Sequence, residues 1–206
     1  QDTLSNSIQK FSDVSCWGDS TGSAKVAAIG GTFPYTHVWN NIDPIALVLN
    51  LPAGWNSVVS TDANGCLIED SVEIFHINPA IGDSITVIQN VSCYNGCDAV
   101  ASISSQGGVL PHTYTWSTGQ LGTVQPDTAF NLCYGSYYII IEDAVGCKFL
   151  DSINISQPIE LLAQARYVAH VTCYGFDNGI AHATGSGGTI PYSYAWDSIN
   201  GQTENP

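Results

Sequence analysis

The cysteines are the residues of this sequence whose type and spacing indicate chemistry. Thiolates pair as disulfides or hold zinc as a tetrahedral set of four ligands. Five of the seven cysteines recur at equivalent places of a repeated pattern: Cys16, Cys66, Cys93, Cys147 and Cys173. The other two, Cys97 and Cys133, have no counterparts elsewhere in the chain. Which chemistry they perform depends on the elements that bring them together.

The chain repeats a unit of about 80 residues. A cysteine, a Gly-Gly pair, a proline and a tryptophan recur in the same order, beginning at Cys16, Cys93 and Cys173. A second block, Leu-x-x-Gly followed by Asp-x-x-Gly-Cys, ends at Cys66 and again at Cys147. Self-similarity at a fixed period indicates one structural unit used several times. We therefore expect three domains, called repeats one, two and three, at residues 1–79, 80–158 and 159–206.

Short runs of alternating apolar and polar residues, broken by Gly, Pro, Asn and Asp, predict β-strands. In repeat two we expect six strands, at residues 84–90, 99–105, 112–117, near 123–125, 137–142 and 148–155. A tryptophan on the third strand, such as Trp116, is typical of the core of an immunoglobulin-like sandwich. The predicted fold class is all-β, with tandem immunoglobulin-like β-sandwich repeats of about 80 residues, stapled by disulfides.

The number of strands decides which cysteines can meet. Six alternating strands place the turn after the first strand and the turn before the last strand at the same end. A seventh strand would place these turns at opposite ends, too far apart for the ~6 Å that disulfide-bonded Cα atoms need. We therefore predict the disulfides Cys16–Cys66 and Cys93–Cys147.

The remaining cysteines follow from the repeat pattern. Cys97 and Cys133 occur only in repeat two, so we expect them to pair with each other. Cys173 is expected to be unpaired, because the third repeat stops before its second cysteine. Zinc bound by Cys93, Cys97, Cys133 and Cys147 is the rival arrangement. Repeat one keeps two of these positions without the other two, which argues against zinc.

The charge balance excludes several classes of partner. Four Lys and Arg residues stand against 18 Asp and Glu residues, giving a net charge of −14. Such a surface repels nucleic acid and anionic lipid. No apolar run reaches the ~20 residues of a membrane-spanning helix. The five histidines lack metal-binding spacing, and no nucleophile elbow or phosphate loop occurs. We therefore expect no enzyme, no nucleic-acid binding and no direct membrane insertion.

The combined order of these motifs resembles the SprB repeat of large cell-surface adhesins from gliding Bacteroidota. In repeat one the resemblance is carried by residues 15–22, 30–35, 51–54 and 62–66, with Trp39. It implies export by the type IX secretion system, an extracellular location at the surface of a Gram-negative bacterium, and movement by the gliding machinery. The family usually has Tyr at the position of Asn56, and repeat two has Tyr137 at the equivalent position. Around Asn56, residues 55–59 are expected to break the strand alternation.

The resemblance also implies O-glycosylation, because exported Bacteroidota proteins carry glycans on Ser or Thr after Asp. Such glycans are bulky and solubilising. The candidate acceptors are Thr3, Ser20, Ser71, Ser84, Thr128, Ser152 and Ser198. The alternative is that Asp-Ser recurs because it suits turns at strand ends.

Calcium is the metal that the acidic turns could bind. The six-strand scheme places Asp19, Asp62 and Asn64 at one end of repeat one, where their oxygens could serve as ligands. In repeat two Val145 replaces the Asn, so the ligand set is not maintained. An Asp in such a turn otherwise accepts backbone hydrogen bonds. We therefore expect no cofactor, with calcium as the alternative.

These features together predict a structural and adhesive rod segment of a large secreted cell-surface adhesin filament, serving gliding motility and surface attachment. Its expected partners are neighbouring repeats of the same chain, the type IX secretion and gliding machinery, and extracellular surfaces or polysaccharides. The alternative is a set of carbohydrate-binding or spacer repeats of an exported polysaccharide-degrading enzyme. Glycan binding by the Tyr, His and Trp face would require an exposed Trp116.

Overall fold

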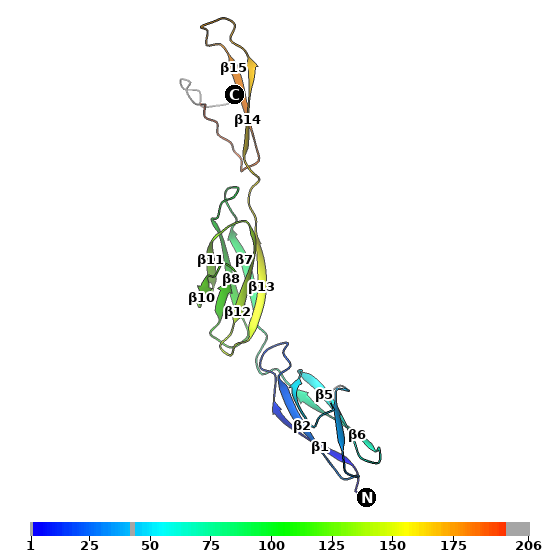
Figure 1. The fold of residues 1–206 in the computed structure, drawn as a ribbon. Coiled ribbons are helices and arrows are strands. Elements are labelled where there is room, and N and C mark those ends of the chain that lie inside the picture. The colour runs from blue at the N-terminus through cyan, green and yellow to red at the C-terminus, as the bar shows by residue number, and fades with distance from the viewer. Residues whose placement is uncertain (1, 42–43, 197–206) are drawn as a thin grey trace.

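Antiparallel strands joined by short turns build the chain. The computed structural model describes residues 2–41 and 44–196, and in this part of the chain it contains strands, β1 to β15, and no helix. The strands form three groups that follow one another along the molecule (Figure 1). β1 to β6 belong to repeat one, β7 to β13 to repeat two, and β14 and β15 to repeat three.

Repeat one contains two three-stranded sheets whose neighbouring strands are antiparallel. The first sheet has the order β1 (Ser5–Ser12), β2 (Gly22–Ile29) and β4 (Leu47–Leu51). The second has the order β3 (Thr36–Trp39), β5 (Gly54–Thr61) and β6 (Leu67–Ile74).

Repeat two has the same two-layer plan with one more strand. One sheet has the order β7 (Gly82–Gln89), β8 (Ala99–Gln106) and β11 (Asp127–Leu132). The other has the order β10 (Leu121–Gly122), β9 (Thr113–Trp116), β12 (Gly135–Glu142) and β13 (Lys148–Ile155). In repeat three, β14 (Leu162–Ala169) pairs antiparallel with β15 (Ile180–Ser186). The predicted all-β fold of tandem immunoglobulin-like sandwiches is confirmed.

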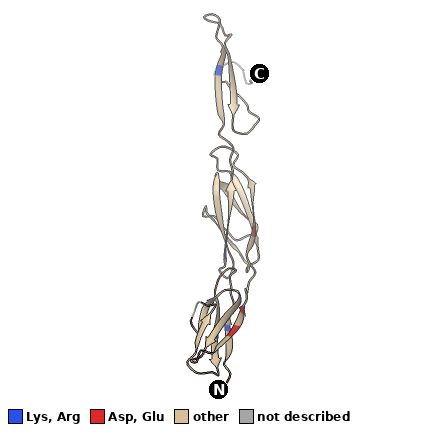
Figure 2. Ribbon diagram, turned by 90° about the vertical axis from the view of Figure 1, so that its right-hand side faces the viewer, with Lys and Arg blue, Asp and Glu red and all other residues tan. Residues whose placement is uncertain are grey.

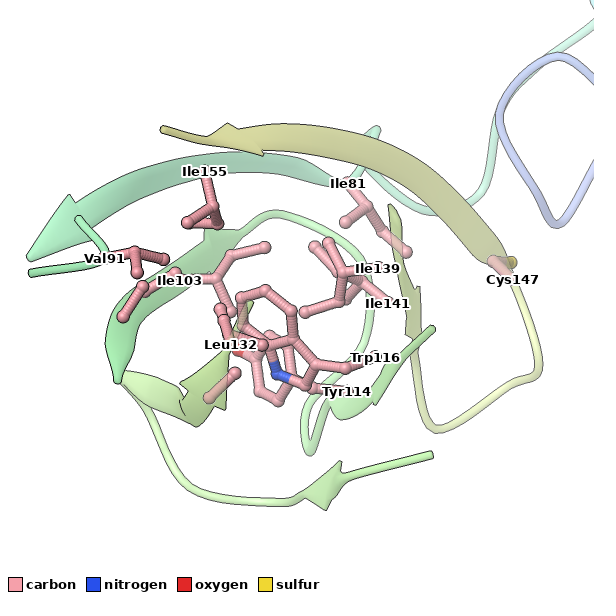
Figure 3. Close-up of a cluster of buried hydrophobic side chains, with 13 residues drawn as sticks. Ile81, Val91, Ile103, Tyr114, Trp116, Leu132, Ile139, Ile141, Cys147 and Ile155 are labelled. Carbon is pink, nitrogen blue, oxygen red and sulfur yellow. The ribbon is translucent and has the colours of Figure 1, made fainter. Parts of the chain in front are cut away.

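The core of repeat two lies between its sheets, because successive side chains of a strand point to opposite faces. Trp116 and Tyr114 from β9 pack there with Ile139 and Ile141 from β12 and Ile103 from β8 (Figure 3). None of these five side chains is more than 1% exposed. The tryptophan of repeat one, Trp39, is buried to the same extent, so this residue fills the core in both repeats.

The predicted strand near residues 123–125 is wrong. Residues 123–126 form the turn between β10 and β11, and β11 is a further strand that pairs with β8. The register of that pairing shifts between Ala129 and Leu132, so the buried residues of β11 do not alternate and the sequence carries no period-two signal there. Repeat two therefore has seven strands, each reversing the chain direction.

In repeat one, too, the first and last turns lie at opposite ends, although it has only six strands. β3 and β4 run in the same direction, because both start at the end of the repeat where β2 finishes. β4 therefore begins at the end of the repeat opposite to the end where β3 finishes, and in repeat two β10 lies between the corresponding strands β9 and β11. The turn between β5 and β6 therefore lies at the opposite end from the turn between β1 and β2.

The segment expected to break the alternation is a regular part of β5. Asn56, Val58 and Ser60 are buried, and the residues between them are less so. The Asn56 side-chain amide donates to the carbonyl oxygens of Pro52 and Gly54, at 2.9 and 3.0 Å. In repeat two the Tyr137 hydroxyl instead binds the peptide group of Cys133. Asn56 and Tyr137 thus hold the same Leu-x-x-Gly loop by different hydrogen bonds.

The Gly-Gly turn of each repeat binds the segment through which the chain enters that repeat. Gly107 and Gly108 have positive φ values of 76° and 56°, a conformation that favours glycine. The Gly108 N–H donates to the Pro79 carbonyl oxygen at 3.1 Å, and a Cβ on Gly107 would collide with the Ala80 carbonyl oxygen. Equivalent bonds join Gly31 to Asp2 and Gly188 to Ile159.

The indole of Trp116 provides a test of this packing. Its Nε1–H donates to Asp127 Oδ2 at 2.7 Å, whereas Ala46 occupies the equivalent position in repeat one and the buried Trp39 Nε1 has no hydrogen-bond partner. A hydrogen bond to a charged group contributes about 1.5–3 kcal/mol. We expect Asp127→Ala to lower the free energy of unfolding of repeat two by about this amount, measured by hydrogen exchange of peptides from β8 and β11.

The natural control is repeat one, where Ala46→Asp should supply the missing acceptor and slow exchange in β2. Unchanged exchange in the Asp127→Ala protein would contradict a stabilising role for this bond.

Candidate functional site

A disulfide between Cys16 and Cys147 joins repeat one to repeat two. Cys16 lies in the turn between β1 and β2, and Cys147 lies in the turn between β12 and β13, with their Cα atoms 5.2 Å apart. Cys147 is buried at the edge of the repeat-two core (Figure 3), and Cys16 packs against that core. The cross-link therefore belongs to a packed junction between successive repeats.

The predicted disulfides Cys16–Cys66 and Cys93–Cys147 are therefore wrong. Cys66 and Cys93 are free and exposed, as is Cys173. The reason is strand parity, since the first and last turns of one repeat lie at opposite ends. A strand of eight residues separates those ends by about 26 Å, far more than a disulfide spans. The last turn of one repeat instead meets the first turn of the repeat before it.

Cys97 and Cys133, expected to pair with each other, are bonded in the structure. Cys97 precedes β8, and Cys133 lies between β11 and β12, so this bond ties the two sheets of repeat two together at the end that faces repeat three. The alternative zinc set is not assembled, because Cys147 lies at the other end and is bonded to Cys16. Among the residues that the structure describes, no group of three or more His, Cys, Asp and Glu side chains could hold a metal ion.

The first turn of repeat one is anchored to the segment by which the chain leaves that repeat. The Val14 N–H donates to the Phe75 carbonyl oxygen, and the Ile77 N–H donates to the Val14 carbonyl oxygen, both at 2.9 Å. The Trp17 ring stacks on His76 with ring centroids 4.1 Å apart. Because the exit segment leads directly into repeat two, Cys16 is held beside the next repeat.

A cleft of about 500 Å³ opens beside the disulfide. Its walls are the first turn of repeat one, residues 79–81 between the repeats, and residues 146–149 of repeat two. Its charged lining residues are Asp19 and Lys148. The cleft is therefore lined by residues of both repeats and of the segment that joins them.

Asp143 holds the last turn of repeat two in the shape that presents Cys147. Its Oδ1 accepts the N–H groups of Cys147 and Val145 at 2.9 and 3.0 Å, and its Oδ2 accepts the Val109 N–H at 3.0 Å. Burial alone would raise the pKa of Asp143, but these backbone hydrogen bonds outweigh it and hold the pKa below its ordinary value.

Asp62 holds the last turn of repeat one in the same way. It accepts N–H groups from Cys66, Asn64 and Thr32, and the bond from Cys66 is the main reason that its pKa is lowered. Asn64 donates its own amide to the Thr32 hydroxyl at 2.9 Å. The alternative calcium set is not brought together, because Asp19 lies in the first turn, at the opposite end of the repeat from Asp62 and Asn64. The turn aspartates serve as backbone acceptors.

The candidate glycosylation acceptors lie mainly on the surface. Five of them are exposed: Thr3, Ser20, Ser71, Ser84 and Ser152. Thr128 is half-buried on β11, and Ser198 lies outside the described residues. Five hydroxyls are therefore accessible to a modifying enzyme without unfolding.

The aromatic face proposed for sugar stacking is inside the sandwich. In repeat two, His112, Tyr114 and Trp116 are at most 2% exposed. Tyr114 and His112 both lie within 2.6 Å of the Ser105 hydroxyl oxygen, in a buried polar cluster. A pyranose ring cannot reach these side chains, so this face does not support the carbohydrate-binding alternative.

The fold and the cross-linked junction define a class of protein, a tandem array of immunoglobulin-like β-sandwich repeats. Within that class, residues 8–44, 85–121 and 168–201 each match the SprB repeat, and together they cover just over half of the chain. The chain therefore belongs to the SprB-repeat family. SprB repeats are found in cell-surface adhesins, and together with the disulfides they indicate a secreted surface protein.

Two solved structures are similar over most of the chain. One is the C-terminal 282-residue fragment of intimin in complex with the intimin-binding domain of the translocated intimin receptor, at 8% identity and a TM-score of 0.35, covering 79% of this chain and 67% of that one. The other contains fibronectin(III)-like modules of Clostridium thermocellum CbhA, at 13% identity and a TM-score of 0.29, covering 73% and 95%. No curated protein matches the chain.

Over the described ranges, no helix is long and apolar enough to cross a membrane.

The last-turn aspartate makes stability depend on pH. Because the folded-state pKa of Asp143 lies below the unfolded value of about 3.9, its carboxylate contributes stability that is fully present above about pH 4. That contribution is lost as the pH falls through the folded-state pKa. We expect Asp143→Asn to destabilise repeat two at neutral pH by about 1–3 kcal/mol and to flatten the acid limb of a plot of melting temperature against pH.

The exposed carboxyl of Glu69 is the control, and Glu69→Gln should leave both the neutral stability and the acid limb in place. A melting temperature of Asp143→Asn equal to that of the unchanged protein at pH 7 would show that the turn does not need this carboxylate.

Proposed function

We propose that the chain is a tension-bearing rod segment of a large secreted adhesin filament that serves surface attachment and gliding motility. The observation that supports this most directly is the Cys16–Cys147 disulfide, which joins successive repeats and not two strands of one repeat. Such a bond holds one repeat on the next and carries load between them, as a filament under tension requires.

The bond changes the path that tension takes through the chain. A pull on the two ends enters repeat one, reaches Cys16, passes through the disulfide and leaves from Cys147. Residues 17–146, which contain β2 to β12, are outside that path. Their sandwich cores can then open without lengthening the rod. In repeat two the Cys97–Cys133 bond lies within the shielded part.

The rest of the surface suits an exposed filament. The repeats lie end to end (Figure 1), and the charged residues are scattered along them (Figure 2). The net charge of −14 keeps such rods apart from one another and from anionic surfaces. We propose that glycans on the five exposed Ser and Thr acceptors coat the rod, and that the type IX secretion and gliding machinery export and move it at the surface of a Gram-negative bacterium. Extracellular surfaces or polysaccharides are the proposed targets of attachment.

Force spectroscopy on the chain, held at its two ends, tests the rod hypothesis. With the disulfides intact, unfolding should not release residues 17–146. Reduction, or Cys16→Ser, should add about 450 Å of contour length, since each extended residue spans about 3.4 Å.

Cys97→Ser is the matched control, because it removes the other disulfide and should not change the extension while Cys16–Cys147 is intact. Equal contour lengths before and after reduction would contradict the proposal.

A further inference from the structure

The junction disulfide uses one cysteine from each of two sets that recur through the chain. Cys16 belongs to the first-turn set, whose other members are Cys93 and Cys173. Cys147 belongs to the last-turn set, whose other member is Cys66. The bond joins the first turn of one repeat to the last turn of the following repeat. Cys66, Cys93 and Cys173 are all free and exposed.

The first turns have the same local structure in all three repeats. The carbonyl oxygen of each first-turn cysteine accepts a hydrogen bond from the N–H three residues later, at 2.9–3.2 Å, in the pairs Cys16 with Asp19, Cys93 with Gly96 and Cys173 with Phe176. In repeat two the Val91 N–H donates to the Ser156 carbonyl oxygen, as Val14 does to Phe75 in repeat one. Cys93 is therefore presented beside repeat three as Cys16 is beside repeat two.

The last turns also match. Asp62 Oδ1 accepts the Cys66 N–H at 2.9 Å, and Asp143 Oδ1 accepts the Cys147 N–H at the same distance. Cys147 is covered by repeat one, whereas Cys66 is exposed. The difference between the two thiols lies in what docks on the turn and not in the turn itself.

The surroundings of Cys93 resemble those of Cys16, except that, among the described residues, no last turn lies against Cys93. The junction between Cys16 and Cys147 is called the occupied junction. A cleft of about 460 Å³ lies between Cys93 and Tyr94 on one side and Ile159 and Leu161 on the other. In the occupied junction the corresponding cleft is also walled by residues 146–149, which belong to the last turn. A last turn placed there would put its cysteine against Cys93, as Cys147 lies against Cys16.

We propose that Cys66, Cys93 and Cys173 form further bonds in the same register as Cys16–Cys147, so that disulfides form a staggered ladder along the filament. Cys66 takes the first-turn cysteine of a repeat docked on the N-terminal end of repeat one. Cys93 takes the last-turn cysteine of repeat three, and Cys173 takes that of a repeat docked on the C-terminal end of repeat three. In each bond two thiols lose two protons and two electrons to a disulfide oxidant, such as oxidised glutathione, which becomes two thiols.

This inference rests on the proposed rod function and makes it more specific. In such a ladder each bond bypasses the cores of two repeats, and tension runs through the short stretch between a last-turn cysteine and the next first-turn cysteine. From Cys147 to Cys173 that stretch is 26 residues, which extend to at most about 90 Å.

Alkylation of the native secreted protein before and after reduction tests the ladder. Cys66, Cys93 and Cys173 should resist alkylation until a reductant is added. Non-reduced peptide mapping should link Cys93 and Cys173 to cysteines of Asp-x-x-Gly-Cys turns, and Cys66 to a first-turn cysteine. Free thiols at these positions beside an intact Cys16–Cys147 bond would overturn the ladder and leave the rod segment standing. Loss of Cys16–Cys147 itself would overturn both.

A second measurement uses the 206-residue chain alone, oxidised at high concentration in a glutathione buffer. The ladder predicts head-to-tail oligomers in which Cys66 of one copy is bonded to Cys173 of the preceding copy. These links should exceed Cys66–Cys66 links by about tenfold, because docking raises the local concentration of the correct partner. Cys66→Ser and Cys173→Ser should each prevent oligomers. Cys93→Ser should not, because repeat three already occupies the space beyond repeat two. Like-with-like links in equal amounts would count against the ladder.

Discussion

The number of times the chain reverses direction between two cysteines decides whether they share an end of the sandwich. In this protein the first and last turns of a repeat lie at opposite ends, because β11 adds a seventh strand to repeat two. That parity directs Cys147 away from Cys93 and toward the preceding repeat. The inter-repeat disulfide, the shielding of the cores from tension and the free thiols at Cys66 and Cys93 all follow from it.

The turns around the cysteines are held by buried carboxylates and glycines. Asp62 and Asp143 satisfy three backbone N–H groups each, which would otherwise be costly to bury. The Gly-Gly turn binds the entering linker through Gly108 and Pro79. The linker, the last turn and the cysteine are therefore connected at one end of each repeat. This arrangement lets one repeat be positioned on the next before any disulfide forms.

Repeats one and two have the same fold, but buried polar groups in them make different hydrogen bonds. Asn56 and Tyr137 bind the same loop, and Asp127 satisfies the Trp116 indole where Ala46 leaves that of Trp39 without a partner. The exposed Ser and Thr acceptors make no packing contacts in the core, and each of them directly follows an Asp in the sequence. The shared elements are the turns at the repeat ends, which supports a role for the junctions in function.

The sequence by itself determined the repeat, the all-β sandwich class and the buried tryptophan, because these depend on local periodicity and composition. It also indicated the pairing of Cys97 with Cys133, because neither cysteine has a counterpart in the other repeats. Only the tertiary structure decided the partner of Cys16. β11 carries a register shift after Ala129, which removes the alternation that would have marked it as a strand. One strand missed in the sequence changes which end of the sandwich every later turn occupies, so the cysteine pairing depended on a feature that no local pattern records.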